Sequence, residues 1–254
     1  MTGHMHTKKT TSIFDCIKTA WLLFWLTTAT VVLFFPIVGA ALASRTGNLA
    51  FSLCRLWARW ILLVTFTRTS VRGKENIEKG RSYVIISNHQ SHFDILALIV
   101  RLGIQYRWII KKELRSIPLF GYALYASRNI FIDRANRESA IRSISEGVNR
   151  LPNGVGLLFF AEGTRSPDGS IQKFKKGGFR TAIEKGMPIL PVTVNGSRKV
   201  LPKGSIVFSP GKIEVVIAEP VETSGYTMEN INELMERVRT TIIGNFNPSF
   251  PEKT

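Results

Sequence analysis

The hydrophobic positions of the chain form one long apolar block followed by a series of short apolar runs. The block covers residues 19–44, which contain no charged residue, and Pro36 stands inside it. A run of this length is long enough to cross a bilayer. Because proline lacks an amide proton, we expect it to divide the block into a helix of about five turns and a shorter tail. A second helix is predicted over residues 49–66, where Arg55 and Arg59 lie among Trp and Leu side chains, a pattern typical of a helix in the membrane interface.

The rest of the chain alternates strand-like and helix-like runs. Strands are predicted over residues 83–87, 106–110, 128–132, 155–160, 189–195, 205–209 and 212–218. Helices are predicted over residues 92–100, 135–150, 177–185 and 227–246. Such alternation is typical of an α/β layered fold in which helices flank a mostly parallel sheet. Gly211, between the last two strand-like runs, predicts an antiparallel hairpin there.

These patterns predict three parts: a polar tail (residues 1–12), a pair of membrane-associated helices (13–69) and one α/β domain (70–254). A chain of 254 residues is long enough for one large domain with such an appendage. A cleavable signal peptide is disfavoured because the apolar block exceeds the usual length of its hydrophobic region. One alternative stays open, namely that both helices pack on the α/β domain instead of on a membrane.

The charge of the chain narrows the choice of partners. Its formal net charge is +16, which predicts a polyanionic partner such as nucleic acid, an anionic membrane surface or a phosphorylated substrate. A nucleic-acid-binding protein would not need the charge-free block, and no nucleic-acid-binding signature is present. Basic residues outnumber acidic ones just after the block, which predicts that the α/β domain lies on the cytoplasmic face. The two cysteines, Cys16 and Cys54, form no disulfide framework, as is typical of a reducing compartment.

Candidate chemistry is concentrated in the heptapeptide Asn88-His89-Gln90-Ser91-His92-Phe93-Asp94. His89 and Asp94 would be about 140° apart on a straight helix, so they can meet only if the chain turns between them. Ser91 is a good helix cap and would supply that turn. An imidazole oriented by a carboxylate is the working part of a general base. Two other interpretations stay open: Ser91 and Asp94 form only a capping box, or His89, His92 and Asp94 bind a metal, although no further His or Cys nearby completes its ligand set.

A second polar cluster follows the strand predicted over residues 155–160. Its members are Glu162, Gly163, Thr164, Arg165 and Ser166. Open α/β sheets bind ligands at the carboxyl ends of their strands, and Arg with hydroxyl groups suits a phosphate. Three lysines before the helix predicted at 177–185 add positive charge near a helix N-terminus. The alternative is an ordinary solvated hairpin loop at residues 166–169.

Taken together, these stretches resemble the PlsC-like, lysophosphatidic acid acyltransferase family. Asn88-His89-x4-Asp94 matches the family's first motif, known as H-x4-D. The segments that resemble the second, third and fourth motifs are Lys111-Lys-Glu-Leu114 with Pro118, Gly121 and Arg134; Phe160-Ala-Glu162-Gly-Thr-Arg165-Ser166; and Pro188-Ile-Leu-Pro191-Val192. Ala161 stands where the third motif more often has Pro. The order and spacing match over roughly residues 70–220.

The resemblance implies transfer of a fatty acyl group from acyl-CoA or acyl carrier protein to the hydroxyl of a lysophospholipid, 1-acyl-glycerol-3-phosphate, giving phosphatidic acid at a membrane bilayer. It implies no resident cofactor and no metal. His89 would take the hydroxyl proton, Asp94 would orient the imidazole, and the hydroxyl would attack the thioester directly. The substrate-binding residues that it implies are Lys111, Arg134, Glu162, Gly163, Thr164, Arg165 and Ser166.

Three other functions compete with this hypothesis. The motifs scarcely separate it from an acyltransferase with another lysolipid acceptor, such as a lyso-ornithine lipid. A serine hydrolase using Ser91 is disfavoured because the chain lacks a G-x-S-x-G elbow. A nonenzymatic membrane lipid-binding protein would not require both His89 and Asp94.

Overall fold

The computed structural model describes residues 12–44 and 46–251, in which helices and strands alternate along most of the chain. The strands are β1 (Thr67–Arg72), β2 (Val84–Ser87), β3 (Gln105–Lys111), β4 (Ile130–Ile132), β5 (Val155–Phe160), β6 (Ile189–Asn195) and β7 (Gly211–Ile217). The α-helices are α1 (Ile13–Ala43), α2 (Asn48–Val64), α3 (Phe93–Arg101), α4 (Phe120–Ala126), α5 (Arg137–Asn149), α6 (Gly177–Lys185), α7 (Ser197–Val200) and α8 (Ile231–Gly244). The 3-10 helices are η1 (Lys74–Asn76) and η2 (Lys112–Ser116).

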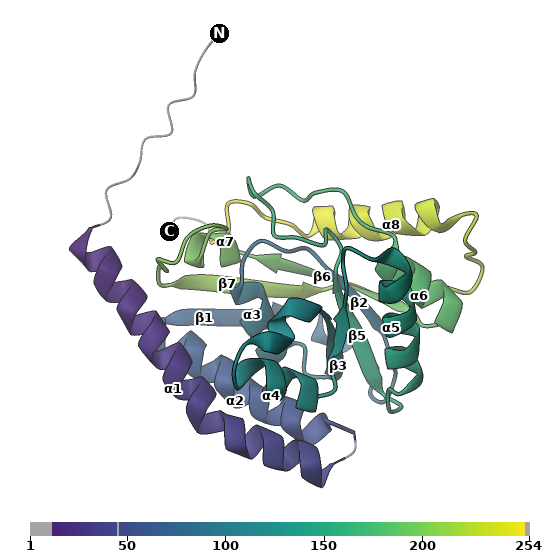
Figure 1. The fold of residues 1–254 in the computed structure, drawn as a ribbon. Coiled ribbons are helices and arrows are strands. Elements are labelled where there is room, and N and C mark those ends of the chain that lie inside the picture. Colours follow the sequence, from purple (N-terminus) through teal and green to yellow (C-terminus); the bar gives the residue numbers. More distant parts are fainter. Residues whose placement is uncertain (1–11, 45, 252–254) are drawn as a thin grey trace.

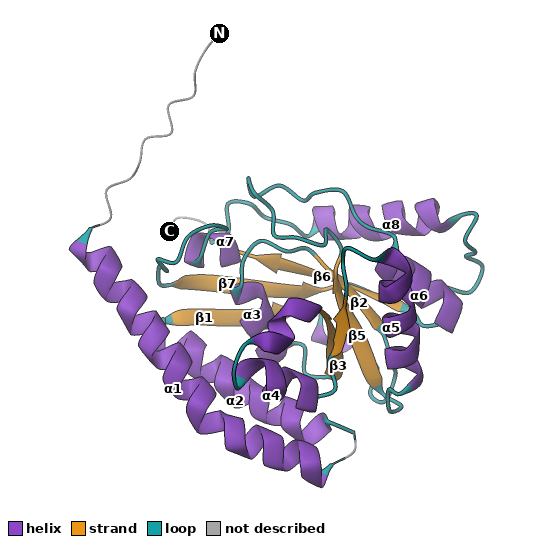
Figure 2. Cartoon of the chain, viewed as in Figure 1, coloured by secondary structure: helices purple, strands orange, loops and turns teal. Residues whose placement is uncertain are grey.

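The strands form one sheet, covered on one face by α2 and α3 and on the other by α5, α6 and α8 (Figure 1). Within the described residues its seven strands have the order β1-β7-β6-β2-β5-β3-β4 (Figure 2). Neighbouring strands are parallel, except that β6 and β7 are antiparallel. The predicted fold class, a layered and mostly parallel α/β sheet preceded by a long apolar helix, is confirmed.

Two strand predictions differ from the structure. Residues 205–209 form no strand, so the hairpin expected at Gly211 is wrong; Ser209 instead donates its amide to Val200 O at the end of α7. The antiparallel partner of β7 is β6, and β7 also pairs in parallel with β1. The sequence does not predict β1, because most of its residues are polar. A polar sequence is possible there because β1 lies at the edge of the sheet and every second residue is exposed. β1 begins at Thr67, so the sheet starts before the expected boundary at residue 70.

α1 is one unbroken helix through Pro36, so the predicted division of the apolar block is wrong. An interior proline costs about 3 kcal/mol because it removes a hydrogen bond and crowds the preceding turn. Packing beyond the proline offsets this cost, since Ile37 and Ala40 are buried against Ala50 of α2. Ser12 caps the helix by accepting from Phe14 N. The predicted polar tail, apart from Ser12, lies outside the described residues.

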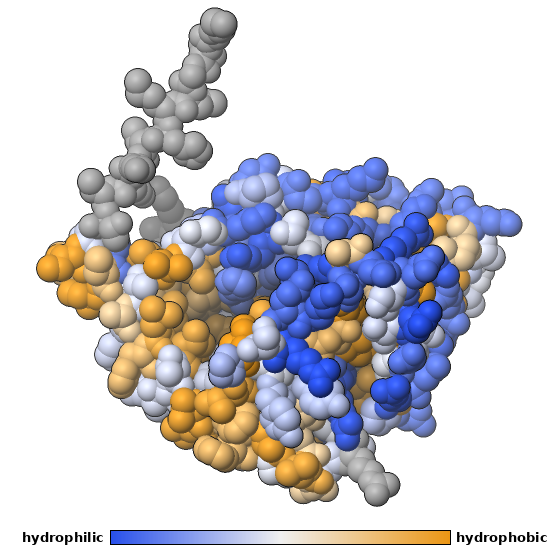
Figure 3. Space-filling model, in the orientation of Figure 1, coloured by the Kyte–Doolittle hydropathy of each residue, from blue (hydrophilic) through white to orange (hydrophobic). Residues whose placement is uncertain are grey.

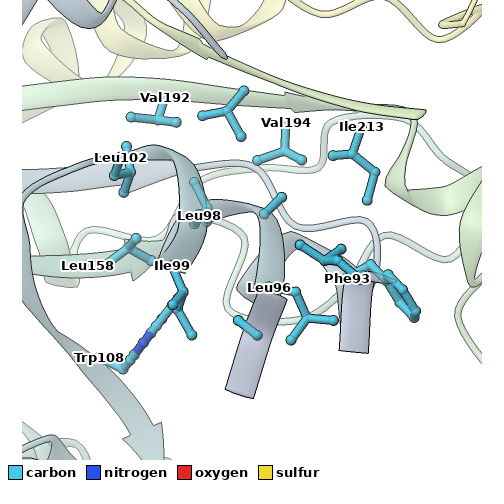
Figure 4. Packing of buried hydrophobic residues seen from close by; sticks show 14 of the residues in the cluster. Phe93, Leu96, Leu98, Ile99, Leu102, Trp108, Leu158, Val192, Val194 and Ile213 are labelled. Carbon is cyan, nitrogen blue, oxygen red and sulfur yellow. The ribbon is translucent and has the colours of Figure 1, made fainter. Parts of the chain in front are cut away.

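α3 connects the candidate site to the core. Figure 4 shows its apolar side chains gathered with those of the neighbouring strands, among them Val192 and Val194 of β6 and Leu158 of β5. Leu98 and Leu102 are fully buried there. Burial of each such leucine contributes about 1.5–3 kcal/mol, so the start of α3 is held firmly against the sheet.

The hairpin of α1 and α2 is attached to the sheet through a buried arginine. Arg107 of β3 is fully buried and donates to Thr46 O at 2.8 Å and to Asn48 Oδ1 at 2.6 Å, in the turn between the two helices. Burial lowers the pKa of Arg107 to about 10, so the side chain is still a cation at neutral pH. α2 therefore packs on the α/β domain, whereas most of α1, a helix long and apolar enough to cross a membrane, is exposed.

Candidate active site

The heptapeptide directly follows β2, a central strand of the sheet, and therefore lies at the carboxyl end of that strand. β2 is buried along its whole length and lies between β5 and β6. Asn88 follows it and exchanges two hydrogen bonds with the backbone of β6: Asn88 Nδ2 donates to Val194 O at 3.0 Å, and Val194 N donates to Asn88 Oδ1 at 2.8 Å. This amide clamp fixes the direction in which the next residue, His89, enters the site.

His89 and Asp94 are in direct contact, with 2.8 Å between His89 Nδ1 and Asp94 Oδ2. The same carboxylate oxygen accepts from Gln90 N at 2.7 Å and from Ser91 N at 2.9 Å. Ser91 Oγ accepts from Phe93 N, the first residue of α3, at 3.1 Å. The turn expected from Ser91 is therefore present. Asp94 is fully buried, and one of its oxygens both accepts from the amide of Ser91 and makes the contact with His89.

The imidazole of His89 lies flat on an aromatic ring and is almost enclosed. Its ring stacks on Phe160 with 3.6 Å between the centroids and 8° between the planes. Trp108 of β3 packs on Phe160 in turn, with 5.6 Å between the centroids. The His89 side chain is 12% exposed. Because Asp94 occupies Nδ1, the free nitrogen of the imidazole is Nε2.

Glu162 joins the loop after β2 to the loop after β5. Its Oε1 accepts from His89 N at 2.8 Å and its Oε2 accepts from Gln172 N at 3.0 Å. The residue is 3% exposed, and burial raises the pKa of its carboxyl group above the usual value. His89 O also accepts from Ser166 N at 2.7 Å. The loops after β2 and β5 are therefore bound to each other on both sides of His89.

The other predicted binding residues surround the loop after β5. Arg134, at the end of β4, donates to Gly163 O at 2.8 Å. Gly163 has a φ of +73°, and Lys175 Nζ would be 2.9 Å from any Cβ at this position. Ser166 is buried and donates to Asp168 Oδ1 at 3.0 Å, so it shapes the loop from inside. Thr164 is exposed.

Arg165 and Lys111 are predicted binding residues that carry positive charge. The half-buried guanidinium of Arg165 donates no hydrogen bond to any described residue. The pKa of His92 lies below its usual value, first because its imidazole is partly desolvated, although the residue is exposed, and second because of the charge of Arg165. The second cause places the guanidinium near the start of α3. Lys111, at the end of β3, is half exposed and 3.4 Å from Glu113.

Several contacts of the site were not predicted. The stacking of His89 on Phe160 and the clamp of Asn88 on β6 join strands that are far apart in the sequence, so no local pattern indicates them. Lys175 is one of the three lysines predicted to add positive charge before α6. The sequence does not predict its contact with Gly163, where a Cβ would be 2.9 Å from Lys175 Nζ. For the metal interpretation, residues 12–44 and 46–251 contain no group of three His, Cys, Asp or Glu side chains that is suited to a metal.

The fold and the site together indicate a class of chemistry. An α/β protein with an enclosed His–Asp pair at the carboxyl edge of its sheet, beside a guanidinium that no described residue pairs with, is suited to proton transfer next to an anionic group. Residues 68–195 match the model of the acyltransferase family, and the chain belongs to this family.

Individual relatives agree with this assignment. The chain is 34% identical over 171 residues to the chloroplastic 1-acyl-sn-glycerol-3-phosphate acyltransferase BAT2 of Brassica napus, over 66% of this chain and 49% of that protein. It is 33% identical over 177 residues to human 1-acyl-sn-glycerol-3-phosphate acyltransferase alpha, over 69% of this chain and 62% of that protein. The chain therefore spans about half to two thirds of the length of these curated relatives.

A solved structure covers almost the whole chain. The crystal structure of the 1-acyl-sn-glycerophosphate (LPA) acyltransferase PlsC from Thermotoga maritima superimposes with a TM-score of 0.79 and 30% sequence identity. The match covers 92% of this chain and 95% of that chain. The fold is therefore PlsC-like, including the apolar helix that precedes the sheet.

Proposed function

We propose that this protein transfers a fatty acyl group from an acyl thioester to the free hydroxyl of 1-acyl-glycerol-3-phosphate, forming phosphatidic acid. The observation that carries the proposal is the 2.8 Å contact between His89 Nδ1 and Asp94 Oδ2, in a site where Arg165 makes no side-chain hydrogen bond to the residues that the structure describes. This contact leaves His89 Nε2 free to accept a proton from a hydroxyl. The names of the relatives described above state this acceptor, which supports the same acceptor for this protein.

In the proposed reaction, His89 Nε2 removes the hydroxyl proton while the hydroxyl oxygen attacks the thioester carbonyl. The tetrahedral intermediate then collapses and the C–S bond breaks. The imidazolium returns its proton to the leaving thiolate. Asp94, held by Gln90 N and Ser91 N, keeps the imidazole in one orientation and stabilises its positive charge.

The acceptor's phosphate would bind beside this pair. Arg165 offers a planar fork of donors that suits a phosphomonoester, and Lys111 and Arg134 add positive charge from the neighbouring strand ends. The shape of this loop depends on Glu162, Gly163, Thr164 and Ser166, which would therefore affect the substrate only indirectly. No resident cofactor or metal takes part in the proposed chemistry.

The acceptor and the product are membrane lipids, and the structure offers a surface for a bilayer. The hydropathy surface shows apolar side chains over α1, α2 and α4 on one flank, whereas the rest of the visible face is mostly hydrophilic (Figure 3). We propose that this flank associates with the membrane and that the catalytic domain lies on the cytoplasmic side, as the basic residues after α1 indicate.

The test is an acyl-transfer assay with purified protein, acyl-CoA and three acceptors: lysophosphatidic acid, glycerol-3-phosphate and a lyso-ornithine lipid. We expect lysophosphatidic acid to have the highest kcat/KM. The variant His89→Ala should lose about 10²- to 10⁴-fold in kcat because the general base is removed. The variant His92→Gln, which replaces the neighbouring imidazole, should keep most of its turnover. Undiminished turnover by a folded His89→Ala variant would overturn the role of His89, and a preference for another acceptor would overturn the substrate.

A further inference from the structure

The orientation of the imidazole determines where His89 Nε2 can accept a proton. The backbone of His89 is fixed on both sides, since its amide donates to Glu162 Oε1 at 2.8 Å and its carbonyl accepts from Ser166 N at 2.7 Å. The imidazole can still turn about two side-chain torsions. The contact of Nδ1 with Asp94 constrains the combination of these torsions without fixing both. Asp94 alone therefore does not determine the direction of Nε2.

The ring of Phe160 provides a second constraint on the imidazole. The two rings lie face to face, with 3.6 Å between their centroids and 8° between their planes. The contact with Asp94 acts in the plane of the imidazole, whereas the Phe160 ring acts perpendicular to that plane. A tilt of the imidazole toward Phe160 would bring atoms of the two rings closer than van der Waals contact. The two neighbours therefore restrict different motions of one side chain.

The register of the sheet places Phe160 beside the catalytic loop. Phe160 is the last residue of β5 and pairs with Ser87, the last residue of β2, which stands two residues before His89. Successive side chains of a strand point to opposite faces of the sheet. Phe160 accordingly packs with the core that contains α2 and α3, and Phe159 packs in the opposite core with α6.

Phe160 is itself supported by a row of aromatic rings. Trp108 of β3 lies 5.6 Å from Phe160 between ring centroids. Tyr106 continues the row at 5.2 Å from Trp108, and Phe51 of α2 follows at 4.8 Å from Tyr106. Trp108, Tyr106 and Phe51 are all buried. Because protein interiors are close-packed, a ring supported in this way has little room to move away from the imidazole.

The stacking also has an electrostatic effect that depends on the state of His89. The face of an aromatic ring is electron-rich and attracts a cation. A histidine that acts as general base becomes a cation when it takes the proton of its substrate, so the attraction is stronger in the transition state than in the resting enzyme. Interactions that are stronger in the transition state raise kcat and leave substrate binding unchanged.

We propose that Phe160 is a positioning residue for acyl transfer: its ring fixes the plane of the His89 imidazole and attracts the imidazolium that forms. This inference rests on the proposed function for the reaction, and on the ring geometry for the role of Phe160. Phe160 acts on the substrates only through His89. An aliphatic side chain would fill much of the same space but would offer neither a flat face nor π electrons.

The first test compares three variants in the acyl-transfer assay. Phe160→Leu keeps an apolar side chain but removes the ring, so we expect kcat to fall about tenfold while the KM of each substrate stays within about twofold of the wild type. Phe160→Tyr keeps the ring and should retain most of kcat. The control Phe159→Leu makes the same change one residue earlier, on the other face of β5, and should lower thermal stability without a comparable fall in kcat.

Nuclear magnetic resonance of the full chain in detergent tests the stacking directly. Protons that lie over the face of an aromatic ring are shifted upfield by its ring current. The chain has four histidines, and the variants His89→Ala and His92→Gln identify the signals of the two in the heptapeptide. The His89 ring protons should be shifted upfield in the wild type, in Phe160→Tyr and in Phe159→Leu, and this shift should be lost in Phe160→Leu.

The outcomes separate the role of Phe160 from the proposed function. Full kcat in a folded Phe160→Leu variant would overturn the proposal. An equal loss of kcat in Phe159→Leu would also overturn it, because the loss would then follow the stability of β5 and not the ring. A wild type with upfield His89 signals but no acyl transfer would contradict the proposed function, whereas an active wild type without those shifts would contradict the stacking.

Discussion

At the scale of single residues, the site is held mainly by hydrogen bonds from backbone amides to buried carboxylates. Asp94 accepts from two amides and the His89 ring on one oxygen, and Glu162 accepts from the amides of His89 and Gln172. Buried carboxylates that bind backbone amides fix the loops around them. The imidazole therefore has little freedom, whereas the guanidinium of Arg165 has no hydrogen-bond partner in the described part of the chain.

The proposed role of Arg165 in binding the acceptor's phosphate leads to a kinetic prediction. Arg165→Ala should raise the KM for lysophosphatidic acid about 10- to 100-fold, because a charge-assisted hydrogen bond contributes about 1.5–3 kcal/mol. The KM for the acyl donor should change little. Steady-state kinetics with each substrate varied in turn provide the measurement, and Arg142→Ala on α5 is the matched control. A rise confined to the donor KM would contradict the assignment.

His92 gives a prediction for the effect of pH on stability. Its pKa is lowered by partial desolvation and by the charge of Arg165, so as the pH falls the unfolded chain binds this proton before the folded protein does. The free energy of unfolding should therefore fall as the pH passes below about 6.5, the usual pKa of histidine. His92→Gln should show a smaller decrease than the wild type. Urea titrations at a series of pH values measure this difference, and equal decreases would contradict it.

At the scale of elements, the segment from η2 to α4 is bent tightly around a glycine. Leu119 has a φ of +59°, and Gly121 lies so close to η2 that a Cβ would be 2.3 Å from Arg115 O. No side chain fits at this distance, so Gly121 sets how α4 folds back on η2. Lys111 directly precedes η2, and its position therefore depends on this bend.

Gly121→Ala should accordingly destabilise the protein by about 1–3 kcal/mol, since the added methyl group forces the backbone of η2 to move. Activity at low acceptor concentration should also fall, because Lys111 shifts. Thermal unfolding and the acceptor KM measure the two effects. Gly244→Ala, at the end of α8 where a Cβ meets nothing within 4 Å, is the matched control. Equal stability of the two variants would show that η2 and α4 separate easily.

At the scale of the whole molecule, an apolar flank and a large positive charge occur together. The exposed large hydrophobic residues lie mostly on α1, α2 and the η2–α4 segment, and the chain carries a net charge of +16. Apolar contact with the bilayer interface and attraction to anionic headgroups act in the same direction. Arg107 joins the helical hairpin to β3, so the flank has a fixed position relative to the sheet.

Vesicle flotation tests this surface. We expect the full chain to bind vesicles rich in an anionic phospholipid more strongly than neutral vesicles, and salt to weaken but not abolish binding. Leu63→Glu, on the exposed face of α2, should lower the bound fraction without changing thermal unfolding. Ser139→Glu introduces the same charge on α5 and should have no effect. Equal binding by both variants would contradict a membrane role for α2.

The local parts of this architecture were predictable from the sequence. The alternating runs predicted the mostly parallel sheet, and β2, β5, β6 and α6 lie within one residue of their predicted bounds. The contact of His89 with Asp94 was predictable because both residues lie in one turn, where Ser91 determines the path of the chain. Periodicity and turn chemistry act over a few residues, and these features depend on nothing more distant.

The tertiary structure decided the rest. β1 is a strand because β7, far along the chain, pairs with it, and α1 continues through Pro36 because α2 packs beyond it. The same holds for the site: Glu162 accepts from the amide of His89, and the backbone of β6 clamps Asn88. The sequence by itself determined which side chains are candidates for the proposed chemistry. Long-range strand pairing and packing decided how these side chains are held and which of them are buried, because those contacts join residues that no local pattern connects.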